Sequence, residues 1–351
     1  MNKNKKNILF LCQIKGSING AQIYNKYIYN HLKKTQKFKI DYLDTNLAYN
    51  AANTGKFNFI KFLKFIFFYF NFLKLFNKYE IFYIVPGNTF LGILRFYLII
   101  IILKFFKKRI IFHHHGYGTF LYIKKFNFLK TIFINSNYIN LVLTNDLKKK
   151  LLKIDKKFNI LVIKNFFDLK IKVKKKINKK LKILFFSNHT KEKGFENFVK
   201  LSHFFKKFEF IICGKSNNWS KNILKNNSNK NIKYLGYVSE KSKKDVYLSS
   251  DLFILQTYYK TEAVPATLLD AMASSCAIIT TFHNGIPETV GKSALFVKKN
   301  DFDDLVNKVK FITKNNQILK KYQIKSFTRY KKSHVSKQKY LKKIESIFDI
   351  F

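Results

Sequence analysis

The stretch TYYKTEAVPATLLDAMASSCAIITTFHNGIPETV, residues 257–290, carries the strongest pattern in this chain. Two acids, Glu262 and Asp270, stand eight positions apart, and Pro265 lies between them. A helix-like run follows the proline, and an apolar strand-like run over 276–280 follows the helix. Proline suits the first turn of a helix, because its φ is fixed and it lacks the N–H that would go unpaired there. The segment therefore predicts a short helix followed by a buried strand.

The start of that helix is suited to bind an anion. Its free N–H groups and the positive end of the helix dipole favour a group such as a pyrophosphate. Glu262 comes just before the helix and can point at sugar hydroxyls, whereas Asp270 lies about a turn and a half inside it and can reach a second polyol such as ribose. Carboxylates accept strong, charge-assisted hydrogen bonds from vicinal hydroxyls. The alternative is a plain αβ repeat with two solvated acids.

Apolar, strand-like runs alternate with helical stretches along the chain. The runs lie at 8–12, 39–43, 81–85, 109–113, 140–143, 159–163, 182–186, 209–213, 232–235, 252–255, 277–280 and 294–297. This order indicates parallel sheets with helices on both faces. We predict an α/β protein with two doubly wound, Rossmann-like domains that face each other across a cleft.

The predicted domains have definite boundaries. The first covers 1–168, a basic linker covers 169–180, and the second covers 181–328. The remaining segment, 329–351, has a helical pattern. Doubly wound sheets bind ligands at the carboxyl ends of their strands, so the predicted site lies in the cleft.

The charge of the chain is extreme, with 67 Lys and Arg, 20 Asp and Glu, and a formal net charge of +47. Taken alone, this charge favours nucleic acid or an anionic membrane as partner. Lysine greatly outnumbers arginine, which is the usual specific contact to guanine, so nucleic acid is disfavoured. The abundance of Lys, Asn, Ile, Phe and Tyr is also typical of an A- and T-rich genome, which accounts for part of the charge.

Several features indicate a cytoplasmic protein. Cys12, Cys213 and Cys276 each sit in an apolar run, as expected of buried thiols in a reducing compartment. The apolar run near the N-terminus is too short for a signal peptide. The most apolar segment, 91–106, falls short of a membrane span and is interrupted by basic residues, so we interpret it as a buried crossover helix.

Residues 56–78 have the pattern of an interfacial helix. Lysines lie along one side at helical spacing, and Phe, Leu, Ile and Tyr fill the rest. A basic stripe beside aromatic residues is typical of helices that lie on anionic lipid. The alternative is a helix packed against its sheet with its lysines in water, and the two interpretations are compatible. The pattern predicts peripheral attachment to the inner face of the cell membrane.

Residues 257–290 resemble the nucleotide-sugar site of retaining glycosyltransferases with the GT-B fold, the large family four. Their usual form reads E-G-F-P-x-x-x-L-E-A-M-A-x-G-x-P-V-I-x-T, then G-G-x-P-E. The resemblance implies transfer of a sugar from a nucleotide-diphosphate donor to a glycan or lipid-linked acceptor, in bacterial surface polysaccharide or lipopolysaccharide synthesis. It also implies that no metal or cofactor is needed, and Asp301, which opens a D-x-D sequence, fits a helix N-cap instead. In that family the C-terminal helix crosses back onto the first domain.

The resemblance assigns roles to individual residues. The resemblance implies three catalytic residues. Glu262 would hold the sugar and Lys193 would neutralise the leaving diphosphate. His115 would contact the donor sugar near the reacting carbon. Asp270 binds the ribose. The other implied donor-binding residues are Gly16, Gly20, Asn188, Gly236, Val238, Ala263, Val264, Pro265, Ala266, Thr267 and Leu268. Neighbouring strand residues alternate sides, so the three histidines at 113–115 are not expected to share a metal.

The chain departs from the family pattern at several positions. Glycine is replaced at Ala263 and Ser275, glutamate at Asp270, proline at Ala277 and arginine at Asn188. Two alternatives stay open, the first because of these replacements and the second because of the net charge of +47. One is a catalytically weakened GT-B partner subunit, and the other is a basic protein that binds nucleic acid.

Overall fold

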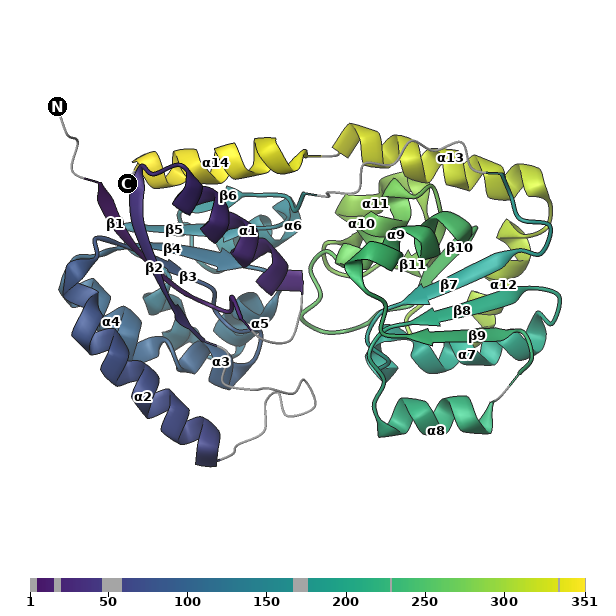
Figure 1. The fold of residues 1–351 in the computed structure, drawn as a ribbon, viewed down its shortest axis with the longest axis horizontal. Coiled ribbons are helices and arrows are strands. Elements are labelled where there is room, and N and C mark those ends of the chain that lie inside the picture. Colours follow the sequence, from purple (N-terminus) through teal and green to yellow (C-terminus); the bar gives the residue numbers. More distant parts are fainter. Residues whose placement is uncertain are drawn as a thin grey trace. The chain divides into compact units, whose positions relative to one another are not determined.

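The computed structural model describes residues 5–15, 20–45, 59–166, 176–227, 229–333 and 335–350. The chain divides into two compact units. Unit 1 comprises Met1–Asn165 and Ser336–Phe351, and unit 2 comprises Phe166–Val335. Within the described residues each unit contains one six-stranded sheet with helices on both faces, which confirms the predicted α/β class (Figure 1).

The sheet of unit 1 is parallel and doubly wound. Its strand order is β2-β1-β3-β4-β5-β6, so the chain changes direction across the sheet between β1 and β3. Ligands of such sheets bind at the carboxyl ends of the strands, at this switch point. The strands are β1 Lys6–Cys12, β2 Phe38–Asp44, β3 Ile81–Ile84, β4 Arg109–His114, β5 Tyr138–Val142 and β6 Ile160–Val162.

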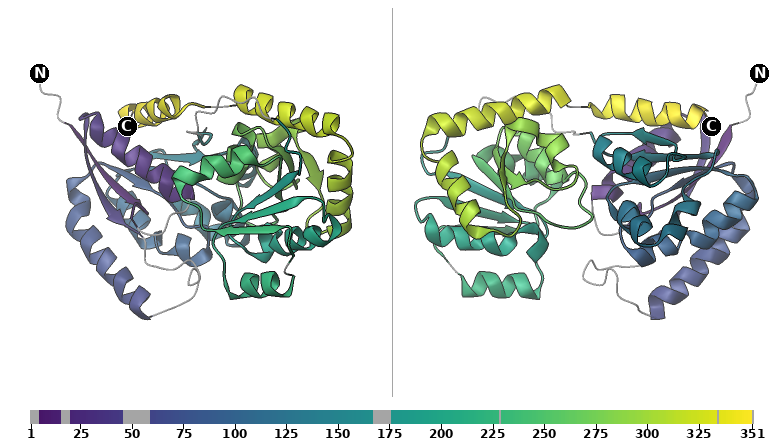
Figure 2. Two further views of the ribbon diagram at one scale, coloured as in Figure 1. Left: turned by 45° about the vertical axis from the view of Figure 1, so that its right-hand side comes forward. Right: turned by 180° about the vertical axis from the view of Figure 1, so that it is seen from behind.

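Two layers of helices cover the sheet of unit 1 (Figure 2). Phe10 pairs in register with Tyr83, so both side chains point to one face, where Phe10 stacks 6.1 Å from Phe348 of α14. Phe82 points to the other face and meets Phe72 of α2 at 6.2 Å. The helices are α1 Gly20–Lys34, α2 Phe59–Leu75, η2 Phe76–Lys78, α3 Phe90–Leu94, α4 Tyr97–Phe105, α5 Gly118–Lys125, η3 Asn127–Ile132, α6 Asn145–Ile154 and α14 Lys337–Ile350.

Unit 2 repeats the same architecture. Its sheet has the order β12-β11-β10-β7-β8-β9, with the switch point between β7 and β10. The strands are β7 Lys182–Phe186, β8 Glu209–Cys213, β9 Ile232–Gly236, β10 Leu252–Leu255, β11 Ala277–Thr281 and β12 Leu295–Val297. The helices are η4 Lys191–Lys193, α7 Phe195–Phe204, α8 Asn218–Asn226, α9 Glu240–Ser249, α10 Ala266–Ala273, α11 Ile286–Val290, η5 Gly291–Ser293, α12 Phe302–Ile312 and α13 Asn316–Ser333.

Most local predictions are confirmed. Every predicted strand is present, and the helix expected after Pro265 is α10. Asp301 is the N-cap of α12 and accepts the Asp304 N–H at 2.8 Å. The three cysteines are free and buried.

The C-terminal segment and the candidate membrane span differ in detail from their predicted forms. The helical pattern near the C-terminus forms two helices, because α13 runs past residue 328 to Ser333 and α14 begins at Lys337 in unit 1. The apolar segment 91–106 is divided between α3 and α4. Among the described residues, no helix combines the length and apolarity that crossing a bilayer requires.

Candidate functional site

The candidate site of unit 2 forms where the loops after β7 and β10 meet, at the switch point of the sheet. Gly194 has a φ of +75°, and a Cβ at this position would lie 2.8 Å from the Cβ of Gln256. Glycine is therefore needed here, both for the left-handed backbone and for the close approach of the two loops. The approach brings Lys193, the last residue of η4, to the loop that carries Glu262.

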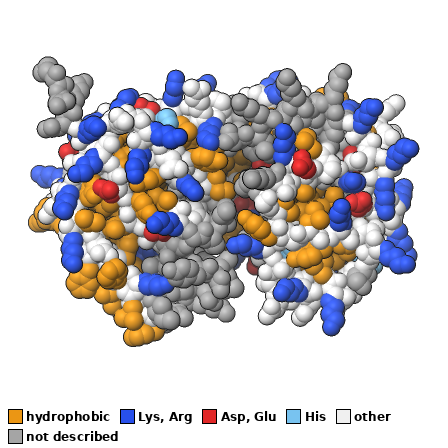
Figure 3. Space-filling view, viewed as in Figure 1, with side chains coloured by type: hydrophobic (Ala, Val, Ile, Leu, Met, Phe, Trp, Pro, Cys, Tyr) orange, Lys and Arg blue, Asp and Glu red, His pale blue; other side chains and the backbone are white. Residues whose placement is uncertain are grey.

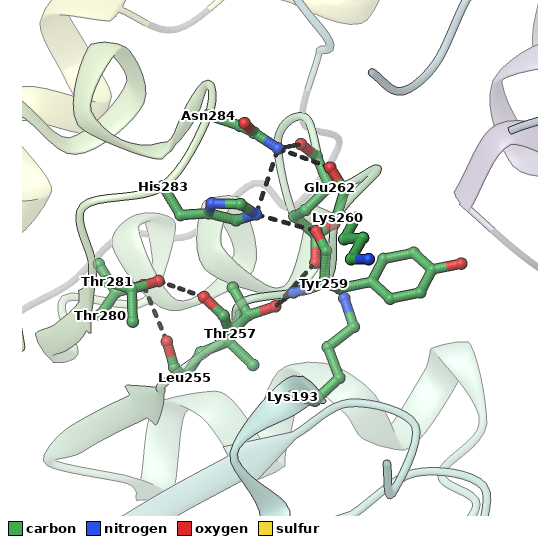
Figure 4. Close-up of polar contacts among 10 residues, drawn as sticks. All are labelled: Lys193, Leu255, Thr257, Tyr259, Lys260, Glu262, Thr280, Thr281, His283 and Asn284. Atoms are coloured by element: carbon green, nitrogen blue, oxygen red, sulfur yellow. Dashed lines mark hydrogen bonds and ion pairs between the residues drawn. The ribbon is translucent and has the colours of Figure 1, made fainter. Parts of the chain in front are cut away.

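Lys193 and Glu262 form an ion pair, although 69 positions separate them in the chain (Figure 4). The two side chains are only 16% and 12% exposed. The Lys193 ammonium also lies 5.2 Å from the centroid of the Tyr259 ring, and Thr257 Oγ1 donates to Glu262 Oε2 at 3.4 Å. Partial burial strengthens attraction between these charges and toward a charged ligand. The structure therefore brings two of the three predicted catalytic residues into contact.

Polar side chains after β11 hold the Glu262 loop in place (Figure 4). Asn284 Nδ2 donates to the carbonyl oxygens of Glu262 at 2.9 Å and Lys260 at 3.0 Å. His283 Nε2 lies 2.9 Å from the Tyr259 carbonyl oxygen, which can only accept, so this nitrogen donates. The sequence pattern indicated no role for either residue. Their position directly after a buried strand was the signal that could have found them.

The N-terminus of α10 adjoins Glu262. Pro265 is its N-cap residue with a φ of −58°, and no side chain among the described residues caps the helix. The first backbone bond into the helix runs from the Leu268 N–H to the Pro265 carbonyl, at 3.0 Å. The amides of Ala266 and Thr267 precede that bond and have no acceptor within the helix. These amides and the helix dipole can hold an anion next to Glu262.

Asp270 lies on the inner side of the same helix. Its carboxylate is 3% exposed and forms an ion pair with Lys243 of α9, a residue that the sequence analysis missed. Burial, and to a smaller extent the negative charge of Asp270, raises the pKa of Tyr330 to about 12. The pairing offsets the cost of burying the carboxylate, because a buried charge needs a partner. Lys243 therefore lies beside Asp270, the residue implied to bind the ribose.

The departures from the family pattern fit the local backbone. Ser275 follows the C-cap of α10 with a φ of +54°, a conformation that glycine adopts more readily than serine. Ala263 is 2% exposed in the loop before α10, and Ala277 is the first residue of β11. The structure accommodates all three replacements without breaking an element.

The remaining predicted residues of unit 2 lie along the carboxyl edge of the same sheet. Gly214 has a φ of +131°, and a Cβ there would lie 1.8 Å from the Ser187 carbonyl oxygen, so the loop after β7 packs against the end of β8. Gly236 ends β9 with a φ of +61° and accepts the Gly214 N–H at 2.7 Å. Asn188 is exposed in the loop after β7, and Val238 is half-buried after β9.

His115 belongs to a polar network in unit 1, at the carboxyl ends of β1, β3 and β4. Its Nε2 lies 3.3 Å from Asn25 Oδ1. The Tyr83 hydroxyl lies 2.6 Å from His113 Nδ1 and 3.4 Å from the same Asn25 oxygen. An amide oxygen only accepts, so His115 donates from Nε2 and keeps a lone pair on Nδ1. Asn25, which sequence patterns missed, holds the ring in this tautomer, and Tyr83, also missed, contacts Asn25 and His113.

The other predicted elements of unit 1 lie nearby in the sequence. His114 points to the opposite face of the sheet and bonds Thr119 at 2.9 Å and Asn140 at 3.0 Å, so the expected alternation of the three histidines is confirmed. Gly20 is the exposed first residue of α1, and no heavy atom of the described residues lies within 4 Å of a Cβ placed there. Gly16 lies outside the described residues, as does the end of the predicted first domain at residue 168.

Buried histidines should make this protein sensitive to acid. Burial lowers the pKa of His114 to about 4, and burial together with His114 lowers that of His115 to about 3. Below the usual pKa of about 6.5 the unfolded chain binds more protons than the folded chain. We expect the free energy of unfolding to fall as the pH drops from about 6.5 toward 4, by on the order of 1 kcal/mol per pH unit for each such ring. Urea unfolding across this range measures the slope.

The histidine effect can be separated from the general charge of the chain. The change His114→Gln should flatten the slope between about pH 6.5 and 4. The exposed His203 on α7 supplies the control, and His203→Gln should leave the slope unchanged. Equal slopes in the wild type and His114→Gln would contradict the assignment.

Comparison with known sequences points to one family. Residues 166–329 match the family model described as Glycosyl transferases group 1. Mannosylfructose-phosphate synthase of Agrobacterium fabrum is 34% identical over 76 residues, which are 21% of this chain and 16% of that protein. The matched part of the chain thus spans less than a fifth of that curated relative.

Three solved structures resemble the chain over nearly its full length. Sucrose-phosphate synthase from Thermosynechococcus elongatus has a TM-score of 0.76 at 12% identity, with 98% of each chain covered. HepE of Anabaena, in complex with UDP and glucose, has a TM-score of 0.70 at 12% identity, covering 99% of this chain and 100% of that one. A glycosyltransferase from Rickettsia africae has a TM-score of 0.66 at 17% identity, with 98% of each covered. This likeness confirms the predicted GT-B fold.

Proposed function

We propose that the chain transfers a glycosyl group from a nucleotide-diphosphate sugar, because residues 166–329 match the family model described as Glycosyl transferases group 1 and the chain has the GT-B fold. The observation that carries the proposal is the contact of Lys193 with Glu262 beside the N-terminus of α10. One cation, one carboxylate and free helix amides then meet at the switch point of unit 2. This set matches a ligand that has a diphosphate joined to a polyol.

In the proposed complex each group of the donor meets a complementary group of the protein. The diphosphate would lie against the amides of Ala266 and Thr267 and would draw the Lys193 ammonium away from Glu262. Glu262 would then accept hydrogen bonds from the sugar hydroxyls. The ribose would meet Asp270 and its partner Lys243. The Lys193–Glu262 ion pair thus holds both side chains close to where the donor needs them.

The reaction follows from this placement. The bond between the anomeric carbon and the phosphate oxygen breaks, and a bond from that carbon to an acceptor hydroxyl forms on the same face of the sugar. The nucleoside diphosphate leaves with the electron pair of the broken bond and takes up the hydroxyl proton. Lys193 and the α10 amides stabilise the charge that develops on the leaving oxygen, which is the main catalytic contribution expected. We propose no metal or cofactor, as the family resemblance implies.

The donor class is a nucleoside diphosphate sugar, and UDP-sugars are the first candidates because HepE was solved with UDP and glucose. The acceptor is proposed to be a glycan or a lipid-linked sugar, with a role in surface polysaccharide assembly, as the sequence resemblance implies. His115, with a lone pair on Nδ1, is proposed to contact the donor sugar. Retention of the anomeric configuration belongs to the same proposal.

Thermal shift against UDP-, GDP- and ADP-sugars tests the proposal. One nucleotide class should raise the unfolding temperature, because a ligand at about a hundred times its Kd stabilises the folded state by roughly 2.7 kcal/mol. The same donor should release its nucleoside diphosphate slowly during incubation with the protein. An unchanged unfolding temperature with every donor, together with salt-sensitive binding to generic DNA, would overturn the proposal in favour of a nucleic-acid binder.

A further inference from the structure

Helix α2 is apolar on both of its faces. Its inner face carries Phe68 and Phe72, which are at most 7% exposed, and Phe72 meets Phe82 of the sheet. Its outer face carries Phe67, which is 69% exposed, and Phe70, which is 59% exposed. A helix that is hydrophobic all round is ordinarily buried in a large core or in lipid. The proposed transfer reaction gives no reason for the outer face of α2.

The outer face of α2 continues onto its neighbours α3 and α4. A shallow groove between α2 and α4 is lined by Phe65, Ile66, Tyr69, Phe70, Leu73 and Leu98. We call the exposed apolar residues here the α2–α4 face: Phe59, Leu63, Ile66, Phe67, Phe70, Leu73, Leu91, Leu98, Ile101, Phe105 and Phe106. Figure 3 shows hydrophobic side chains gathered over this part of unit 1, with Lys and Arg side chains around them. Contiguous apolar patches of this kind mark interaction sites.

The arginine within this apolar segment is turned into the protein. Arg95 donates through Nη1 to the Thr45 carbonyl oxygen at 3.0 Å, and its own carbonyl accepts the Tyr69 hydroxyl at 2.5 Å. Burial lowers its pKa to about 10. The charge that interrupts the apolar sequence therefore does not interrupt the apolar surface.

The chain segment that forms the α2–α4 face carries almost entirely positive charge. Residues 59–145 contain ten Lys and two Arg, and Glu80 is the single acid in this stretch. Lys74, Lys78, Lys104 and Lys107 are exposed on or beside α2 and α4. Two copies of such a face would bring like charges together, which opposes a dimer through this surface. Apolar rings with lysines beside them match a surface that is apolar inside and anionic outside.

We propose that the α2–α4 face docks unit 1 onto an anionic lipid bilayer, with the two helices lying in the interface and their lysines at the headgroups. The exposed Phe and Leu side chains enter the acyl boundary, while long lysine side chains extend to the phosphates. This inference goes beyond the proposed function, because it concerns a surface of unit 1 and not the donor site of unit 2.

Co-sedimentation with vesicles tests the proposal. The wild-type chain should bind vesicles of phosphatidylcholine mixed with phosphatidylglycerol, and should bind pure phosphatidylcholine much more weakly. Phe67→Ser combined with Phe70→Ser should weaken binding to the anionic vesicles at least roughly tenfold, since two exposed rings no longer enter the lipid. The matched control is Phe204→Ser with Phe311→Ser, at residues of unit 2 that are 62% and 48% exposed, and it should bind like the wild type.

The charge contribution is measured in the same assay. Lys74→Gln with Lys104→Gln should weaken binding to anionic vesicles roughly thirtyfold, at roughly fivefold for each lysine near the surface. Lys200→Gln with Lys310→Gln, on helices of unit 2, should have little effect. All four variants should keep the thermal shift with the nucleotide donor, which separates a failure of docking from a failure of donor binding.

Three outcomes would overturn the proposal. The first is that the wild-type chain does not bind anionic vesicles. The second is that the phenylalanine variant binds them as tightly as the wild type, which would mean that charge alone attracts the chain. The third is that sedimentation velocity shows a dimer that the phenylalanine variant dissociates, which would assign the α2–α4 face to a second copy of this chain.

Discussion

Replacing Glu262 with glutamine is expected to lower kcat/KM with the nucleotide-sugar donor by at least about a hundredfold, and Glu262→Ala is expected to abolish turnover. The carboxylate is 12% exposed, and its loop is fixed by Asn284 and His283. A donor sugar held by this carboxylate loses its orientation when the charge is removed, and small misplacements of a reacting carbon are costly. Release of the nucleoside diphosphate from the donor is the measurement.

The Glu262→Gln variant should still bind the nucleoside diphosphate product. Glu262 forms an ion pair with Lys193, so removing the carboxylate leaves the ammonium available to the diphosphate. Calorimetry should therefore show product affinity that is equal to the wild type or tighter. Glu196→Gln, on the exposed Glu196–Lys200 pair of α7, is the matched control and should keep full activity. Full activity of Glu262→Gln would remove this residue from the site.

Replacing Lys193 with methionine is expected to lower kcat by roughly a hundredfold to a thousandfold, the usual cost of losing one stabilising group at a developing negative charge. Lys193 is 16% exposed and lies against Glu262 in the loop before α10, so its charge acts where solvent screening is reduced. Methionine keeps an unbranched apolar side chain of similar length while removing the ammonium, together with its contact with the Tyr259 ring. Steady-state release of the nucleoside diphosphate measures the loss.

Product binding separates the two variants. Lys193→Met should weaken the nucleoside diphosphate roughly tenfold or more, whereas Glu262→Gln should not, because only the lysine attracts the phosphates. Lys200→Met breaks the exposed pair on α7 and is the control. If Lys193→Met bound the product as tightly as the wild type and kept its kcat, the diphosphate would have to be held elsewhere.

Local patterns in the sequence were sufficient for the elements of the fold. Strands β7, β8 and β10 were predicted to the residue, because buried parallel strands are short apolar runs with clear breaks. Helix α10 was predicted from Pro265 and the run that follows it. Connected βα repeats with this spacing also imply doubly wound sheets, since parallel strands need helical crossovers.

Side-chain partners could not be found in the same way. Lys243 comes from an ordinary lysine-rich helix, and only the packing of α9 on α10 makes it the partner of Asp270. Asn25 of α1 meets His115 across 90 positions of the chain, and Tyr83 of β3 meets His113 across 30, so no local period marks them. Contacts of this kind depend on strand order and loop conformation.

Which aromatic rings of α2 face outward could not be predicted from the sequence either. Residues 56–78 showed lysines beside aromatic rings, but a ring against the sheet and a ring in solvent look the same in a linear pattern. The structure separates Phe72, which is fully buried, from Phe67, which is 69% exposed. It also joins α4 to the same surface, although the sequence favoured a buried helix for that segment.

The sequence by itself determined two doubly wound sheets and the helix after Pro265. Those features follow from apolar periodicity and backbone preferences, which act over a few residues. The tertiary structure alone decided that Lys193 meets Glu262, that Lys243 meets Asp270, and that α2 and α4 share one exposed apolar face. The Lys193–Glu262 contact arises at the switch point of the sheet and from the close approach at Gly194, and the other two arise from the packing of helices that are distant in the sequence.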